Sequence, residues 1–113
     1  MSPAFFRIIR GPIPTLEDFL SARDLGVSIV PPHGLEREWA ASISVYDSLE
    51  YTVRRAQTTR REIGRFVIRL VVPTDGSIEV AQTTRNRRHH SIYGRPEDLI
   101  RLVRGDSIPV SRG

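Results

Sequence analysis

The fold class follows first from one apolar stretch in the middle of the chain, Arg65-Phe66-Val67-Ile68-Arg69-Leu70-Val71-Val72-Pro73. This stretch is rich in β-branched residues and apolar on nearly both faces, which is typical of a strand inside a sheet. A turn signal follows it, Thr74-Asp75-Gly76-Ser77, because glycine accepts the positive φ that tight turns need. Residues 77–82 then return as a strand. We therefore expect the strand at residues 65–73 to lie at the sheet centre and residues 65–82 to form an antiparallel hairpin.

Two further strands are expected toward the N-terminus. One is a short apolar run closed by Gly11-Pro12, namely Phe5-Phe6-Arg7-Ile8-Ile9-Arg10. The other covers residues 39–46, where apolar Ala41, Ile43 and Val45 alternate with Ser42, Ser44 and Tyr46. A period of two predicts a strand with one apolar and one polar face. Trp39, at its start, is expected in the core.

About three helices are expected beside these strands. Thr15 caps the first, which starts within residues 14–20, with Asp18 three residues after the cap, and which Gly26 ends. A capping-box pattern at residues 47–50 opens a second helix, which should run to about Thr59. Pro96 suits the first turn of a third helix, which Gly105 should end. Residues 26–38 and 83–95 are expected to be loops, and residues 107–110 an edge strand.

The 113 residues are therefore predicted to form one α+β domain, residues 1–113. Its sheet should be mainly antiparallel, with four to five strands and about three helices packed on it. No apolar run approaches the roughly 18 residues of a membrane helix, and no secretory signal is recognised. The chain has no cysteine, which removes disulfides and thiolate chemistry. We expect a cytoplasmic bacterial protein that does not enter a membrane.

Charge is divided unevenly along the chain. All seventeen basic residues are Arg, which by itself fits a GC-rich genome, and the net charge is +4. Residues 1–53 carry four Arg and seven acidic residues, or −3, whereas residues 54–113 carry thirteen Arg and six acidic residues, or +7. Such a split indicates a basic surface for nucleic acid, phosphates or an acidic partner. A solvated Arg-rich surface without a ligand is the alternative.

The densest polar cluster lies at residues 83–95. Arg supplies a fixed fork of donors for phosphate, His exchanges protons near neutral pH, and Tyr stacks on bases. The cluster therefore predicts a site for a phosphate-bearing partner, either nucleic acid or a nucleotide. The residues expected to bind are Arg85, Arg87, Arg88, His89, Tyr93 and Arg95. No metal is expected, because adjacent His residues with few carboxylates make a poor ligand set.

Several other residues are candidates for catalysis, although a purely structural role could explain each of them. Arg7 interrupts an apolar strand, so it must be paired, exposed or used for an anion. No G-x-S-x-G turn surrounds Ser42 or Ser44, which argues against a hydrolase of that type. Glu79 could be an acid catalyst, although a surface salt bridge is the commoner role.

The opening Phe-Arg-Ile, the polar strand Ser42–Tyr46 and the helix that follows with Ala56 resemble small ADP-ribosyltransferase-like domains. That superfamily includes the RES-type toxins and RNA 2′-phosphotransferases. The resemblance implies that Arg7 contacts the pyrophosphate of an NAD-like ligand and that Ser44 or Tyr46 holds the nicotinamide ribose. It covers about the first two-thirds of the chain and rests on the order of elements. The late-strand Glu of that class has no counterpart, because Glu79 comes too early.

Three functions therefore stay open. The first is binding of a phosphate-bearing partner through the basic half. The second is an NAD- or nucleotide-processing enzyme, which would use Arg7, Ser44, Tyr46 and His90, with NAD as its candidate cofactor. The third is a protein–protein interaction module. The sequence sets neither the substrate nor the oligomeric state.

Overall fold

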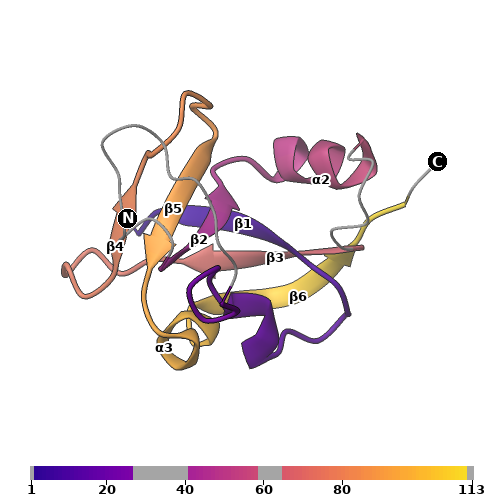
Figure 1. Ribbon diagram of the computed structural model, residues 1–113. Helices are drawn as coiled ribbons and strands as arrows, with labels where there is room; N and C mark the ends of the chain where they lie inside the picture. The colour runs from indigo at the N-terminus through magenta and orange to yellow at the C-terminus, as the bar shows by residue number, and fades with distance from the viewer. Residues whose placement is uncertain (1, 27–40, 59–64, 112–113) are drawn as a thin grey trace.

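The structure is a computed structural model, which describes residues 2–26, 41–58 and 65–111 (Figure 1). Within these ranges, six strands form one sheet in the order β4-β5-β2-β1-β3-β6, with every neighbouring pair antiparallel. The strands are β1 (Ala4–Ile9), β2 (Ser42–Tyr46), β3 (Phe66–Val71), β4 (Glu79–Ala81), β5 (His89–Tyr93) and β6 (Val103–Pro109). The helical elements are the 3-10 helix η1 (Leu16–Phe19) and the α-helices α2 (Leu49–Thr58) and α3 (Pro96–Ile100). The mainly antiparallel α+β arrangement is thus as predicted, with one strand more and one α-helix fewer.

Apolar side chains fill both faces of the sheet, but unequally. The larger cluster joins strand residues such as Val45 and Leu70 to Phe19 of η1 and Leu99 of α3. The smaller cluster lies on the other face, where Ala56 of α2 packs over β1 and β3. Helix α2 therefore covers one face, and η1 and α3 cover the other (Figure 1). None of the helices in the described ranges is long and apolar enough to cross a membrane.

The pattern of β2 is confirmed. Ile43 and Val45 are buried in the larger cluster, whereas Ser42 and Ser44 point to the opposite face and Ser44 is exposed. The cap of η1 is also confirmed, because the Asp18 carboxylate accepts a hydrogen bond from the Thr15 backbone N–H (2.8 Å). This helix is a single turn rather than the longer one expected.

The cap of α2 lies one residue later than the sequence pattern indicated. The Tyr51 N–H donates to Ser48 Oγ (3.2 Å), so Ser48 rather than Asp47 is the capping residue. Among the described residues, the helix ends at Thr58, close to the predicted end.

The expected hairpin at residues 65–82 is wrong. The turn forms, with Gly76 at φ 83°, but the two strands go to different places. β3 lies between β1 and β6, so both of its edges are occupied. β4 instead pairs with β5 at the opposite edge of the sheet.

Two further expectations are wrong nearby. Residues 83–95 are not one loop, because they contain β5, which pairs with β2 on one side and β4 on the other. Gly105 does not end the last helix; α3 stops at Ile100, and Gly105 lies inside β6 at φ 77°. β6 is an edge strand, as expected for residues 107–110. The predicted loop at residues 26–38 and the core position of Trp39 fall outside the described residues, apart from Gly26.

Candidate functional site

Polar side chains of β2 and β5 lie next to one another on the face that also carries α2. The strands are antiparallel, and their register places Ser42 opposite Tyr93, Ser44 opposite Ser91 and Tyr46 opposite His89. Side chains directly opposite in such a pair share a face and lie within contact distance. On the reverse side, Ile43 is opposite Ile92, and both are buried. The alternation thus separates a polar row from the core.

His89 lies at one end of this row, opposite Tyr46. Its Nε2 lies 2.9 Å from Ser44 Oγ, and its Nδ1 lies 3.4 Å from Thr84 Oγ1. The Tyr46 ring meets the imidazole edge-on, with 5.7 Å between ring centroids. Burial, helped by the nearby positive charge of Arg55 and by His90, lowers the pKa of His89 below its usual 6.5. The imidazole is therefore neutral at pH 7, and it bridges the two hydroxyl groups.

Helix α2 contributes a cation and a second tyrosine beside His89. The Arg55 guanidinium lies 5.4 Å from the Tyr46 ring centroid, and the Tyr51 ring lies 5.4 Å from that ring. Burial raises the pKa of Tyr46, with Arg55 acting in the opposite direction. The phenol consequently stays protonated at neutral pH. Neither Tyr51 nor Arg55 was a candidate from the sequence, although their i, i+4 spacing places them on one helix face.

The loop between β4 and β5, residues 82–88, is tied to α2 by Asn86. Its side-chain Nδ2 donates to the Tyr51 hydroxyl (2.8 Å), and its Oδ1 accepts from the Arg88 N–H (3.0 Å). The Arg88 carbonyl accepts from the Asp47 N–H (3.0 Å). These bonds hold the loop against the start of the helix. We refer to residues 82–88 as the basic loop.

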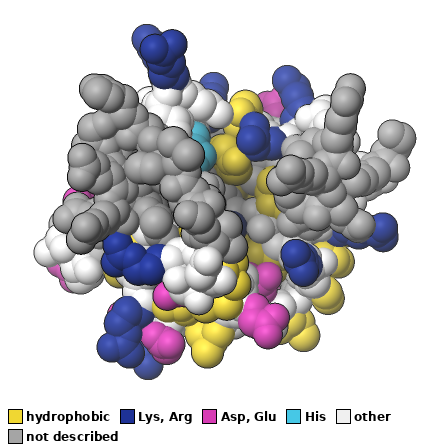
Figure 2. All heavy atoms as spheres, in the orientation of Figure 1, with side chains coloured by type: hydrophobic (Ala, Val, Ile, Leu, Met, Phe, Trp, Pro, Cys, Tyr) yellow, Lys and Arg dark blue, Asp and Glu magenta, His cyan; other side chains and the backbone are white. Residues whose placement is uncertain are grey.

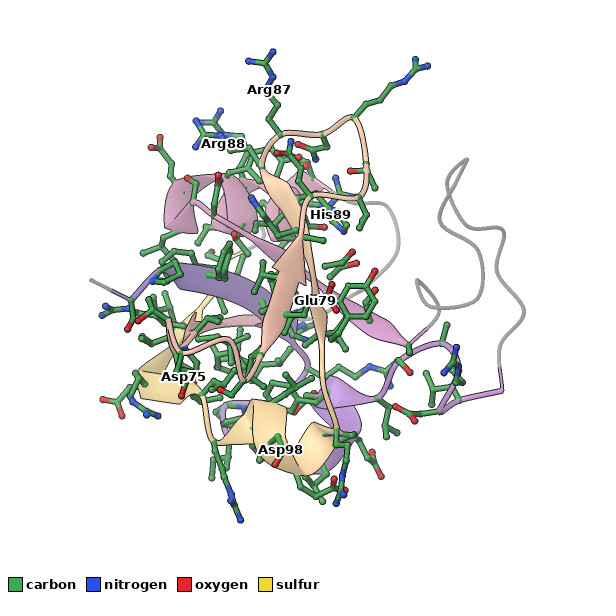
Figure 3. All side chains as sticks on the ribbon, turned by 90° about the vertical axis from the view of Figure 1, so that its left-hand side faces the viewer. Asp75, Glu79, Arg87, Arg88, His89 and Asp98 are labelled. Carbon is green, nitrogen blue, oxygen red and sulfur yellow. The ribbon has the colours of Figure 1, made fainter. Side chains whose placement is uncertain are left out.

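The three arginines of the basic loop differ in their partners. Arg88 lies 3.4 Å from the Asp47 carboxylate. Arg85 and Arg87 are exposed and form no salt bridge with any described residue. Figure 3 shows Arg87 pointing away from the body of the protein. Figure 1 shows this loop at the top of the molecule. In the same place in Figure 2, a basic side chain projects outward and no acidic side chain lies beside it.

Arg7 lies where β1 and β2 separate. These strands pair only between Phe6 and Tyr46. Beyond that pair, the Arg7 side chain reaches from β1 to the backbone of β2. Its Nε donates to the Asp18 carbonyl (2.8 Å) and its Nη1 to the Ser44 carbonyl (2.6 Å). Burial lowers the pKa of Arg7 to about 10, against the opposing effect of Asp18, so the side chain is charged at pH 7. It is half-buried and lines a cavity of about 300 Å³.

The structure brings together only some of the predicted site residues. Those that share one region are Ser44, Tyr46, His89, Arg85, Arg87 and Arg88, and Arg7 reaches this region through the Ser44 carbonyl. The separate ones are His90, Tyr93 and Arg95. His90 faces the core side, with its ring 5.0 Å from that of Phe5.

Tyr93 and Arg95 lie toward the other end of β5. Tyr93 is opposite Ser42 and Glu79, and Glu79 is exposed. Arg95 precedes α3 and lies 3.3 Å from the Glu97 carboxylate. The basic loop and α3 are at opposite ends of the molecule in Figure 3. No cluster of three or more His, Asp or Glu that could hold a metal occurs among the described residues.

Comparison of the chain with models of known families, with curated proteins and with solved structures gives no match.

Proposed function

We propose that this protein binds the phosphate groups of a nucleic acid through the basic loop and the polar face of β2 and β5. The observation that carries the proposal is the pair Arg85 and Arg87. Both are exposed guanidinium groups without an acidic partner among the described residues. Their loop is held in place by Asn86 rather than by the arginines themselves. Arginines presented in this way are free to contact phosphate.

The surroundings of the loop also favour an anionic partner. Arg55 adds positive charge beside Tyr46 and close enough to His89 to lower its pKa, and the neutral His89 lies beside the exposed Ser44 hydroxyl. Hydroxyl, imidazole and guanidinium groups all contact sugar and phosphate in nucleic-acid complexes. At the opposite end, Arg95 has its own carboxylate partner, Glu97, and in Figure 2 basic and acidic side chains touch at that lower end.

A binding measurement with a matched control tests this proposal. Arg95 and Arg101 are exposed residues that flank α3 on its two sides. Fluorescence anisotropy would compare wild type, Arg85→Gln/Arg87→Gln and the control Arg95→Gln/Arg101→Gln on labelled single-stranded RNA, single-stranded DNA and duplex DNA at low salt. Both double variants lose two positive charges, so net charge alone would weaken them equally. We expect the loop variant to lose most of the affinity and the control to stay near wild type. No binding by wild type, or equal losses in both variants, would contradict the proposal.

A second candidate is a nucleotide-processing activity of the ADP-ribosyltransferase-like type, with NAD as the ligand. The observation in its favour is Arg7, a charged group beside a cavity that Ser44 also lines. Thermal unfolding with NAD, ADP-ribose and nucleotides tests it, because a ligand at a hundred times its Kd adds about 2.7 kcal/mol to stability. A shift that disappears in Arg7→Met would support this candidate. No shift with any of these ligands would remove it.

A further inference from the structure

Ser44 and His89 form a hydroxyl–imidazole pair that no sequence motif marks. Ser44 is exposed on β2, and its Oγ lies 2.9 Å from Nε2 of the buried His89 on β5. The pair arises from strand register, since His89 is diagonal to Ser44 across two neighbouring strands. A reactive hydroxyl with a base at hydrogen-bonding distance is the arrangement that activates a serine nucleophile.

The imidazole is held in an orientation that suits this role. Thr84 Oγ1 lies 3.4 Å from Nδ1, and the Tyr46 ring packs against the imidazole. When Nδ1–H donates to Thr84, Nε2 carries the lone pair and accepts from the Ser44 O–H. A third group that orients the base is the usual companion of such a pair. Thr84 is thus a positioning residue.

The guanidinium of Arg7 also contacts Ser44, at its backbone carbonyl rather than at its hydroxyl. The Arg7 Nη1 donates to the Ser44 carbonyl, and Nε donates to the Asp18 carbonyl. Arg7 Nη2 donates to none of the residues that the structure describes. Arg7 and Ser44 line the same cavity of about 300 Å³, together with Ser42. The Arg7 side chain starts on the core face, because Arg7 is opposite the buried Ile68. The cation on the face of the Ser44 hydroxyl is Arg55, which acts on both Tyr46 and His89. A guanidinium on that face favours an electrophile that carries negative charge, such as a phosphoryl group.

We propose that Ser44 is a nucleophile that accepts a phosphoryl group, with His89 as its general base. Ser44 Oγ attacks phosphorus and forms an O–P bond, while the bond from phosphorus to the leaving group breaks. The leaving group departs with the electron pair, and the Ser44 proton passes to His89 Nε2. This inference does not depend on binding of nucleic acid by the basic loop.

Labelling with diisopropyl fluorophosphate tests the proposal. The reagent loses fluoride when a serine oxygen attacks its phosphorus, and the adduct is located by mass spectrometry of peptides. We expect a single adduct at Ser44 in the wild-type protein and none in Ser44→Ala. His89→Gln should lower the labelling rate by roughly 10²–10⁴-fold, the usual contribution of a general base. Ser77→Ala, at an exposed serine between β3 and β4, should label like wild type.

Two further variants test whether the Thr84 hydroxyl is needed for the reactivity of Ser44 or only for folding. Thr84→Val should slow the labelling of Ser44, and Thr84→Ser should restore it, because only the hydroxyl can orient the imidazole. Circular dichroism and thermal unfolding would show that each variant is folded. Because Ser44 is exposed, Ser44→Ala is expected to fold even if His89→Gln does not. The proposal is overturned if the wild type gives no adduct at Ser44, or if Ser42, Ser48 or Ser91 reacts at the same rate.

Discussion

The two faces of the β2–β5 pair have the same backbone and opposite chemistry. On one face, Ile43, Val45 and Ile92 are almost completely buried. On the other, the Ser44 hydroxyl is joined to the His89 imidazole, and the buried Ser91 hydroxyl is joined to that of Thr83. The apolar face is stabilised by removal of surface from water, whereas the polar face needs its hydrogen bonds satisfied wherever it is buried. One face therefore holds the fold together, and the other carries the polar groups on which the proposed functions depend.

The largest loss of stability is expected from substitutions on the apolar side of the sheet. Leu70 and Ile68 are buried on β3 within the larger core cluster. Leu70→Ala or Ile68→Ala should lower the free energy of unfolding by roughly 2–5 kcal/mol, because each removes apolar contacts and leaves a cavity. Chemical denaturation of each variant measures this loss. Unchanged stability in both would contradict the assignment of these residues to the core.

A smaller loss is expected where the polar face is itself buried. The hydroxyls of Ser91 and Thr83 lie 2.7 Å apart in a buried pair. Ser91→Ala removes one partner and should cost about 1–3 kcal/mol, the range for losing a buried hydrogen bond. The exposed Ser44→Ala is the comparison on the same face. If both variants unfold at the same denaturant concentration, burial does not distinguish these two serines.

The pH dependence of stability should report on His89. Burial lowers its pKa in the folded state below the value of 6.5 that it has in the unfolded chain. The unfolded chain therefore binds more protons below about pH 6.5, and stability falls as pH decreases through that value. Thermal unfolding at several pH values between 5 and 8 should show this fall. His89→Gln should flatten it, and an unaltered profile would contradict the burial of a neutral imidazole.

The smallest effect is expected at the end of the molecule opposite the basic loop. The Arg95–Glu97 pair is largely exposed, and exposed ion pairs contribute about 0–1 kcal/mol. The free energy of unfolding of Arg95→Gln should therefore lie within about 0.5 kcal/mol of the wild-type value. A larger loss, measured by denaturant titration, would show that this end of the sheet depends on its charges.

Local patterns in the sequence predicted part of this arrangement. The alternation at residues 41–46 identifies the two faces of β2, and Thr15 with Asp18 identifies the start of η1. Both depend on neighbours in sequence, which is why they could be found. β5 was not found, because His89 and His90 have the composition of a loop and only pairing with β2 and β4 makes them a strand.

The sequence predicted which residues belong to the candidate site better than it predicted which of them lie together. Arg85, Arg87 and His89 were expected from their density in one segment. Strand pairing sets which of them meet Ser44, and pairing joins residues 45 positions apart. The same long-range pairing sends His90 to the core side and separates Arg95 from the basic loop.

The salt dependence of nucleic-acid binding tests the proposed role of the basic loop most directly. The logarithm of the affinity for single-stranded RNA falls linearly with the logarithm of salt concentration, with a slope of about −0.7 for each phosphate contact. If Arg85 and Arg87 each contact one phosphate, Arg85→Gln/Arg87→Gln should flatten that slope by about 1.4, and Arg95→Gln/Arg101→Gln should leave it unchanged. A slope that is the same in wild type and in the loop variant would contradict the claim that the basic loop holds phosphate.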